Sequence, residues 1–320
     1  MSKSSQIIAN TGTQKILMMG RMNAGKTSIH SILFSDFTAY QTKTLPFTNS
    51  INESSVMFLG HKLRIDDCGG QDELMMHYIK NISHQVFTDV EFLIYVFDIQ
   101  FKEKETDFNT YKAIIDELLK YSKNARIFVL LHKTDLITDV QLKEKTIANF
   151  KREIEEITPR ESLLSVCGTS IWDETLYVAW SNIIKYILPD IRFFNDSLSS
   201  IASTVLCDEV ILVEKFTFLV LGSYSKRAEE GEIAKYETIS RMVKNFKIEC
   251  AKNGKEFTSV NINSKKFSVL IQEFTKNTYI LMLFYNKNIK PALVSLNLKL
   301  ASQIFESSKN DELKNLKLLW

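Results

Sequence analysis

The sequence predicts an α/β domain with a parallel-rich sheet, followed by a smaller α+β domain. Nearly continuous apolar runs at residues 90–97 and 126–131 alternate with helical patterns, as in a parallel sheet that helices cover on both faces. A glycine-containing turn at residues 20–27 joins the first strand pattern to the first helix pattern. Beyond Pro189 the alternation gives way to strand patterns typical of an antiparallel sheet.

The composition is that of a globular protein with a full core. Of 320 residues, 45% are apolar and 24% are charged, and this length favours two domains. With 40 basic and 38 acidic residues the net charge is +2, so we expect no nucleic-acid partner. Four separated cysteines without a C-x-x-C spacing indicate reduced thiols.

Targeting patterns are missing from the sequence. The N-terminus lacks the apolar core of a signal peptide, and Ser2 stands where myristoylation requires glycine. The last residues, Lys317-Leu318-Leu319-Trp320, are not a prenylation box, and no apolar run reaches the roughly 20 residues that span a bilayer. We therefore expect a cytoplasmic protein without direct membrane insertion, which partners would have to carry to a membrane.

The first motif, residues 20–27, reads G-R-M-N-A-G-K-T and matches the G-x-x-x-x-G-K-[ST] pattern of a phosphate-binding loop. Its glycines let backbone N–H groups approach a polyphosphate, and the N-terminus of the helix expected at 28–34 adds partial positive charge. Lys26 would reach the β- and γ-phosphates, and the Thr27 hydroxyl would bind Mg²⁺. A chance turn is the alternative, disfavoured because the motif is complete and in context. The nucleotide-binding residues expected here are Arg21, Met22, Asn23, Ala24, Gly25, Lys26, Thr27 and Ser28.

The second motif, residues 67–71, ends a strand pattern at 62–66 and reads D-C-G-G-Q. Asp67 would hold Mg²⁺ through a water, the Gly70 N–H would approach the γ-phosphate, and Gln71 would orient the attacking water. The alternative is an ordinary strand-ending turn. Between the two motifs, residues 40–53 form a polar, irregular segment suited to sensing the nucleotide. One of its hydroxyls, at Thr42, Thr44, Thr48 or Ser50, is expected to complete the Mg²⁺ shell.

The third motif, His132-Lys133-Thr134-Asp135, has the form of the guanine-reading pattern N/T-K-x-D. Asp135 would accept hydrogen bonds from N1–H and the exocyclic amine of guanine, which adenine does not offer, and the Lys133 stem would cover the base. His132 in place of asparagine leaves the first contact open. All three motifs follow strand patterns, and ligands bind parallel sheets beyond the carboxyl ends of the strands.

Four stretches resemble the Rag family of Ras-related GTPases, specifically the Rag A/B type, whose yeast equivalent is the first Gtr protein. They are residues 15–21 (K-I-L-M-M-G-R), 67–72 (D-C-G-G-Q-D), the H-K-x-D motif, and 169–177 (T-S-I-W-D-E-T-L-Y). The resemblance implies a P-loop, Ras-like GTPase domain at 15–189 and a roadblock (longin-like) dimerisation domain at 190–306. We expect residues 1–14 to be a flexible N-terminus and 307–320 a tail.

For the site, the resemblance implies GTP/GDP and Mg²⁺ as cofactors and slow GTP hydrolysis with Gln71 and Lys26 as catalytic residues. Thr48 aligns best with the Mg²⁺-binding threonine, so the expected metal ligands are Thr27, Thr48 and Asp67. The further nucleotide-binding residues are Thr42, Thr48, Gly70, His132, Lys133, Asp135, Ser170 and Ile171. Asp66 stands where the family usually has tryptophan, and we expect it to point to the opposite face of its strand.

For the whole protein, the resemblance implies a heterodimer with a Rag C/D-type subunit, paired through the C-terminal domain, in amino-acid signalling to the TOR kinase. A membrane scaffold complex would recruit it to the lysosomal or vacuolar surface, and an activating protein would stimulate hydrolysis. Met22, Asn23 and the unusual segment 45–52 favour an alternative. In that alternative, the chain is a nucleotide-loaded scaffold subunit with negligible hydrolysis.

The C-terminal half shows no catalytic constellation, and its pattern predicts a five-stranded antiparallel sheet with packed helices. A helix carrying Leu198 and Val205 precedes strands at 209–215 and 217–222, and a helix follows at 232–252. Strands at 256–262, 266–274 and 278–284, a turn at 286–288 and a helix from Pro291 to about 305 complete the pattern. Such sheets assemble through edges or helices; the alternative is a lone capping domain.

Overall fold

The computed structural model describes residues 13–187, 191–226, 232–255, 258–265, 267–285 and 292–303. Residues 1–12, the turn expected at 286–288, Pro291 and the tail from 307 lie outside the described residues. The chain divides into two compact units, Met1–Trp172 and Asp173–Trp320. The domain boundary expected at residue 189 stays a prediction.

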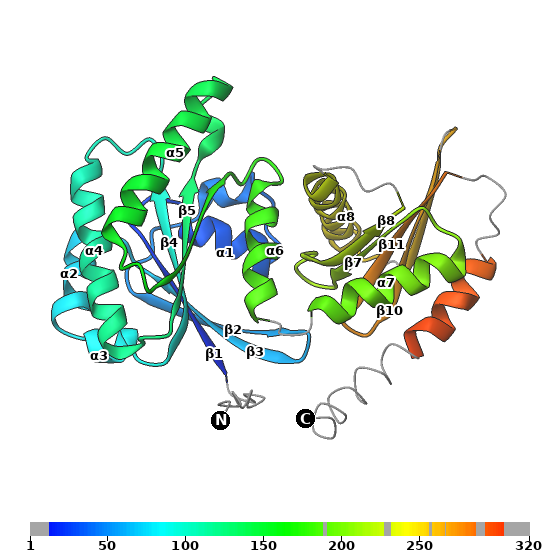
Figure 1. Cartoon of the computed structure of the whole chain (residues 1–320), viewed down its shortest axis with the longest axis horizontal. Helices are drawn as coiled ribbons and strands as arrows, with labels where there is room; N and C mark the ends of the chain where they lie inside the picture. The colour runs from blue at the N-terminus through cyan, green and yellow to red at the C-terminus, as the bar shows by residue number, and fades with distance from the viewer. Residues whose placement is uncertain are drawn as a thin grey trace, which may run out of the picture. The chain divides into compact units, whose positions relative to one another are not determined.

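The first unit is built on a six-stranded sheet in the order β2-β3-β1-β4-β5-β6 (Figure 1). The edge strand β2 pairs antiparallel with β3, and the other pairings are parallel, which confirms the parallel-rich prediction. The strands are β1 (Gln14–Met19), β2 (Ile51–Phe58), β3 (His61–Cys68), β4 (Val90–Asp98), β5 (Arg126–His132) and β6 (Leu163–Thr169).

The expected irregular segment at 40–53 is shorter than predicted. A 3₁₀-helix, η1 (Gln41–Thr44), lies within it, and β2 begins at Ile51, inside the range expected to be irregular. The strand extends because Ile51 pairs with Cys68 and Asn52 with Asp67. These β2 residues are polar or partly exposed, so hydrophobic periodicity did not reveal them.

Helices cover both faces of this sheet: α1 (Lys26–Phe34), α2 (Asp72–Lys80), α3 (Ser83–Phe87), α4 (Lys104–Tyr121) and α5 (Val140–Ile157). One core cluster joins α2–α5 to the sheet, with Leu17 and Tyr95 meeting Tyr111 of α4, while α1 lies on the other face (Figure 1). The helix predicted at 28–34 is confirmed by α1, and the helical patterns that alternate with the apolar runs are confirmed by α4 and α5, whereas α2 and α3 were missed. Helix α2 buries only Met75 and Tyr78, which is too few for a clear apolar stripe.

The second unit contains a five-stranded sheet in the order β8-β7-β11-β10-β9, with every pairing antiparallel. This confirms the predicted sheet. Its elements are α6 (Thr175–Ile187), α7 (Ile191–Val205), β7 (Glu209–Glu214), β8 (Val220–Ser225), α8 (Glu232–Lys252), β9 (Ser259–Asn263), β10 (Ser268–Thr275) and β11 (Thr278–Phe284). Residues 292–303 are helical.

The strand predicted at 217–222 begins later, at Val220. The Glu214 carboxylate accepts hydrogen bonds from the Thr217 backbone N–H and hydroxyl, both at 2.7 Å, and so folds residues 215–219 into a turn. On one face of the sheet, Ile211 and Val213 pack with Val243 of α8, and α7 lies on the other face (Figure 1). Among the described residues, no helix combines the length and apolar character needed to cross a membrane.

Candidate nucleotide-binding site

The three sequence motifs meet at one edge of the first sheet. Strands β1, β3, β5 and β6 run parallel, so the loops after them gather at their carboxyl ends. There they surround a cavity of about 430 Å³, which we name the main cavity. Its lining residues are Met22, Asn23, Gly25, Lys26, Thr27, Ser28, Thr42, Lys43, Leu45, Pro46, Phe47, Thr48, Gly70, His132, Lys133, Asp135, Leu136, Ile171 and Trp172.

The loop between β1 and α1 has the geometry of a phosphate cradle. Gly25 caps α1 with φ 101°, and Asn23 also adopts a left-handed conformation at φ 65°, which asparagine tolerates better than most residues. The Lys26 ammonium donates to the Gly20 carbonyl at 2.7 Å and to the Arg21 carbonyl at 2.9 Å. Burial lowers the pKa of Lys26. A buried cation at the N-terminus of a helix suits an anionic ligand.

The side chains of Thr27, Asp67 and Thr48 form an oxygen cluster beside that cradle. Thr27 Oγ1 donates to Asp67 Oδ2 at 2.7 Å and lies 2.8 Å from Thr48 Oγ1. The other carboxylate oxygen, Asp67 Oδ1, is buried with no hydrogen-bond partner, and burial raises the pKa of Asp67. Hard oxygen ligands with an unsatisfied carboxylate oxygen fit Mg²⁺. Of the rival hydroxyls, Thr42 donates to the Ala39 carbonyl and Thr44 to the Gln41 carbonyl.

Gly70 brings the second motif against the cradle. Its carbonyl accepts from Met22 N–H at 2.7 Å, and a Cβ at Gly70 would lie 2.4 Å from the backbone of residues 21 and 22. Only glycine allows this approach. The Gln71 amide donates to Asn49 Oδ1 at 3.2 Å.

Two predicted residues face a second cavity, of about 500 Å³, rather than the main cavity. Gln71 and Arg21 line it together with Asp72 and Phe101. The Arg21 guanidinium lies 4.5 Å above the Phe101 ring and pairs with Asp72 at 3.1 Å. The structure therefore does not bring the Arg21 side chain into the main cavity. Ala24 is fully buried within the loop.

At the other end of the main cavity, the third motif is held by neighbouring side chains. Asp135 Oδ1 accepts from the buried Ser170 hydroxyl at 2.6 Å, which aims the carboxylate, and Ile171 lines the cavity. The Lys133 ammonium pairs with Asp98 Oδ2 at 2.7 Å. His132 Nδ1 lies 2.9 Å from Thr169 Oγ1, and burial lowers the pKa of His132 to about 4. The imidazole is therefore neutral, and it packs against Gly25.

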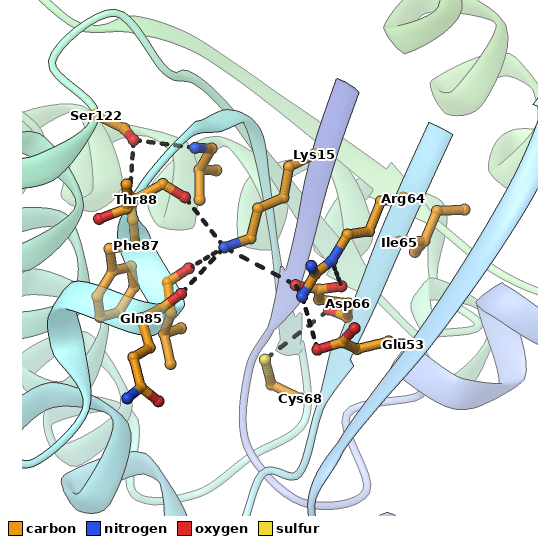
Figure 2. Close-up of polar contacts among 12 residues, drawn as sticks. Lys15, Glu53, Arg64, Ile65, Asp66, Cys68, Gln85, Phe87, Thr88 and Ser122 are labelled. Atoms are coloured by element: carbon orange, nitrogen blue, oxygen red, sulfur yellow. Dashed lines mark hydrogen bonds and ion pairs between the residues drawn. The ribbon is translucent and has the colours of Figure 1, made fainter. Parts of the chain in front are cut away.

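Asp66 points away from Asp67, as expected from strand alternation. Figure 2 shows its carboxylate between two cations, 2.8 Å from Arg64 Nε and 3.9 Å from Lys15 Nζ. The Lys15 ammonium also donates to the carbonyls of Val86 at 2.7 Å and Thr88 at 3.1 Å (Figure 2). Asp66 thus joins β3 to β1 through Lys15, and Asp67 is left to face Thr27.

Comparison with known proteins agrees with this geometry. Residues 15–243 match the Gtr1/RagA G protein conserved region. The chain belongs to the Gtr1/RagA G protein family. It is 37% identical to Ras-related GTP-binding protein A of Dictyostelium discoideum, over 93% of this chain and 98% of the relative. It is 36% identical to GTP-binding protein gtr1 of Schizosaccharomyces pombe, over 93% and 96%.

Membership in the Gtr1/RagA family makes the chain a small GTPase that binds guanine nucleotides, and it confirms the resemblance found in the sequence. A weaker similarity, 25% identity over 71% of this chain and 66% of the relative, extends to GTP-binding protein GTR2 of Saccharomyces cerevisiae. The first unit supplies the G-protein sheet, and the antiparallel sheet of the second unit is consistent with a roadblock-like domain.

Sequence reasoning missed several residues that line the main cavity: Lys43, Leu45, Pro46, Phe47, Leu136 and Trp172. Trp172 directly follows the predicted Ser170 and Ile171, so its place next to the site could have been inferred. The segment 43–47 has no periodicity that would show which side chains face inward.

Proposed function

We propose that this Gtr1/RagA-family chain is a Rag A/B-type molecular switch that binds GTP or GDP with Mg²⁺ and hydrolyses GTP slowly. The observation that carries the proposal is the oxygen cluster of Thr27, Asp67 and Thr48, whose two threonines line the same cavity as Asp135. A metal-phosphate site and a guanine-reading group in one cavity suit a guanine nucleotide.

Each group has a distinct role in this proposal. Asp135, aimed by Ser170, accepts from the N1–H and amine of guanine. Lys26 neutralises phosphate charge, and Thr27, Thr48 and Asp67 hold Mg²⁺, which supplies charge neutralisation at the transferring phosphate. Gln71, next to Gly70, orients the attacking water. Thr48 belongs to the segment after η1. Its contact with Mg²⁺ therefore orders that segment when the γ-phosphate is present.

Slow turnover follows from the lack of a cationic finger. No arginine is among the described residues that line the main cavity, and Arg21 is engaged with Asp72 and Phe101. An arginine supplied by an activating protein raises GTP hydrolysis by about 10³–10⁵-fold in this class of enzyme. We therefore propose that an activating protein supplies that charge in trans.

Single-turnover hydrolysis of GTP by the pure protein tests the proposal. We expect slow turnover, and slower still for Gln71→Leu with GTP binding retained, because only the positioning of water is lost. Asp135→Asn should shift nucleotide preference from guanine toward xanthine nucleotides, which controls for the base-reading role. Rapid turnover without a partner would contradict the need for an activating protein, and preference for ATP would contradict the guanine site.

The second candidate function is a nucleotide-loaded scaffold subunit with negligible hydrolysis. Its support is Met22, which is 46% exposed and lines both cavities next to Gly70. A side chain of this size crowds the space beside the γ-phosphate, where the water would be placed. The nucleotide bound after purification discriminates the two functions: Gln71→Leu changes the GTP-to-GDP ratio of a switch and leaves that of a scaffold unchanged.

We also propose that the chain works as a heterodimer with a Rag C/D-type subunit in amino-acid signalling to the TOR kinase. In that role a membrane scaffold complex recruits it to the lysosomal or vacuolar surface. Support comes from the weaker similarity to GTR2, the edge strands β8 and β9 and the exposed Met242 and Phe246 on α8.

Analytical ultracentrifugation tests the pairing. We expect the chain by itself to self-associate or aggregate, and a C/D-type subunit to convert it to a 1:1 complex. The variant Phe246→Glu introduces a charge on α8 and should weaken that complex. The control variant Lys62→Glu changes the charge of an exposed lysine on the first unit and should not weaken it. A stable monomer of the isolated chain at micromolar concentration would contradict the proposal.

A further inference from the structure

The 3₁₀-helix η1 is organised by its own hydrogen bonds. Gln41 Oε1 accepts from the Thr38 backbone N–H at 2.7 Å, and the Leu45 N–H donates to the Thr42 carbonyl at 3.2 Å. Residues three apart eclipse in a 3₁₀-helix. Tyr40, which caps η1, and Lys43 within it therefore share one face.

That face meets Trp172. The Tyr40 and Trp172 rings pack edge to face with their centroids 5.1 Å apart, and the Lys43 ammonium lies 5.1 Å from the centroid of the Trp172 ring and 5.3 Å from that of Tyr40. These three side chains are named the aromatic wall. Lys43 and Trp172 both line the main cavity, so the wall joins η1 to the loop after β6 across the cavity rim.

The wall stands at the base end of the cavity. The Trp172 backbone N–H donates to Ser170 Oγ at 3.0 Å, and the same hydroxyl donates to Asp135 Oδ1 at 2.6 Å. One hydrogen-bonded chain thus connects the group that would read guanine to the backbone of Trp172, which carries the indole of the wall. On the other side, η1 leads within a few residues to Thr48 in the metal-binding cluster.

We propose that Tyr40, Lys43 and Trp172 close the base and ribose end of the nucleotide site and slow nucleotide release. The inference rests on the proposed guanine-nucleotide function. A nucleotide leaves only after the contact of Lys43 and Tyr40 with Trp172 has opened. Thr48 lies in the same segment, at the phosphate end. Because the γ-phosphate of GTP orders that segment and GDP lacks it, the wall retains GTP longer than GDP.

The test is the dissociation rate of radiolabelled GDP and GTPγS from the full chain, chased with unlabelled nucleotide. A label on the ribose is avoided, since it would itself contact the wall. Cation–π and aromatic contacts at exposed sites are worth roughly 0.5–1.5 kcal/mol each, which corresponds to about 2–10-fold in rate. We expect release about threefold faster in Lys43→Ala and about tenfold faster in Trp172→Ala, with Trp172→Phe intermediate.

Lys62→Ala is the matched control, because Lys62 is an exposed lysine in β3 that lies outside the cavity lining. The double variant Lys43→Ala/Trp172→Ala should release nucleotide no faster than Trp172→Ala. Each of the two changes removes the same contact, between Lys43 and Trp172, so their effects should not add. Unchanged release in Trp172→Ala, with a thermal unfolding midpoint equal to that of the wild type, would overturn the inference. A wild type that binds no guanine nucleotide would instead contradict the proposed function.

Discussion

The imidazole of His132 lies against Gly25 so closely that a Cβ at Gly25 would stand 2.6 Å from His132 Cδ2 and 2.9 Å from Nε2. The third motif therefore supports the first: the residue at the end of β5 packs beneath the cap of α1. His132 acts in this arrangement through the shape of the phosphate loop, and the contact to guanine is proposed for Asp135 alone.

Gly25→Ala should destabilise the fold and weaken nucleotide binding. A left-handed alanine costs about 1–2 kcal/mol, and the collision with His132 adds to that cost. Gly60→Ala is the matched control, since Gly60 also has a positive φ, 89°, but a Cβ there meets no atom within 4 Å. Urea unfolding should show a loss for Gly25→Ala at least about 1 kcal/mol larger than for Gly60→Ala. Equal losses would contradict the contact.

His132 should make the fold sensitive to mild acid. Burial and the neighbouring Lys133 lower its pKa to about 4, against the opposing pull of Asp135 and Asp98. In the unfolded chain the pKa of His132 is near 6.5. Above about pH 6.5 the imidazole is therefore neutral in both states, and its contribution to the free energy of unfolding is complete. It is lost as the pH falls toward 4, and it amounts to about 3 kcal/mol. His132→Asn removes this titration, so unfolding measured from pH 7 to 4.5 should lose less stability than in the wild type. If the stability of the wild type and that of His132→Asn changed with pH in the same way, the assignment of this pH dependence to His132 would be wrong.

Asp66 should matter more to stability than Glu53, although both pair with Arg64. Asp66 is buried and also faces the buried Lys15, whose ammonium would lose its counter-charge in Asp66→Ala. We expect that change to cost about 3 kcal/mol. Glu53→Ala removes an exposed partner and should cost less than about 1 kcal/mol. Chemical denaturation of the two variants measures the difference, and similar costs would rule out the Lys15 role.

Asp72 should influence hydrolysis through Gln71. The pair with Arg21 ties the first turn of α2 to the phosphate loop, directly after Gln71. Asp72→Ala should slow single-turnover GTP hydrolysis by about tenfold, because positioning errors of about 1 Å are costly. The pair is surface-exposed on the Asp72 side, so stability should change by less than about 1 kcal/mol.

Glu73→Ala is the control for that experiment, since Glu73 carries the other acidic charge in the first turn of α2. It removes the same interaction with the helix dipole but no contact with Arg21. Equal hydrolysis rates in Asp72→Ala and Glu73→Ala would show that the ion pair does not position Gln71.

Much of the first unit could be predicted because its signals are local. The strands at 90–97 and 126–131 are buried on both faces, so their apolar runs stood out, and each motif directly follows its strand. The position of Thr48 among four hydroxyls could not be deduced from residues alone. It depends on how the segment after η1 crosses to Thr27, which is a tertiary contact.

The features that sequence reasoning missed share one physical cause. The short helices α2 and α3 and the polar start of β2 are decided by packing and strand pairing rather than by periodicity. Arg21 is similar: its place in the motif predicts a contact with phosphate, but the Phe101 ring and Asp72 hold its side chain on the far side of the loop.

The hydrogen bond between Ser170 and Asp135 joins residues 35 positions apart, and it has a consequence for synthesis of the chain. Ser170 follows β6, the last strand of the first sheet to leave the ribosome. The Asp135 carboxylate, proposed to read guanine, is therefore aimed only after that strand has docked. A ligand that binds only the finished sheet stabilises it by mass action, so the cellular guanine nucleotide pool would act on the newborn protein at the last step of its folding.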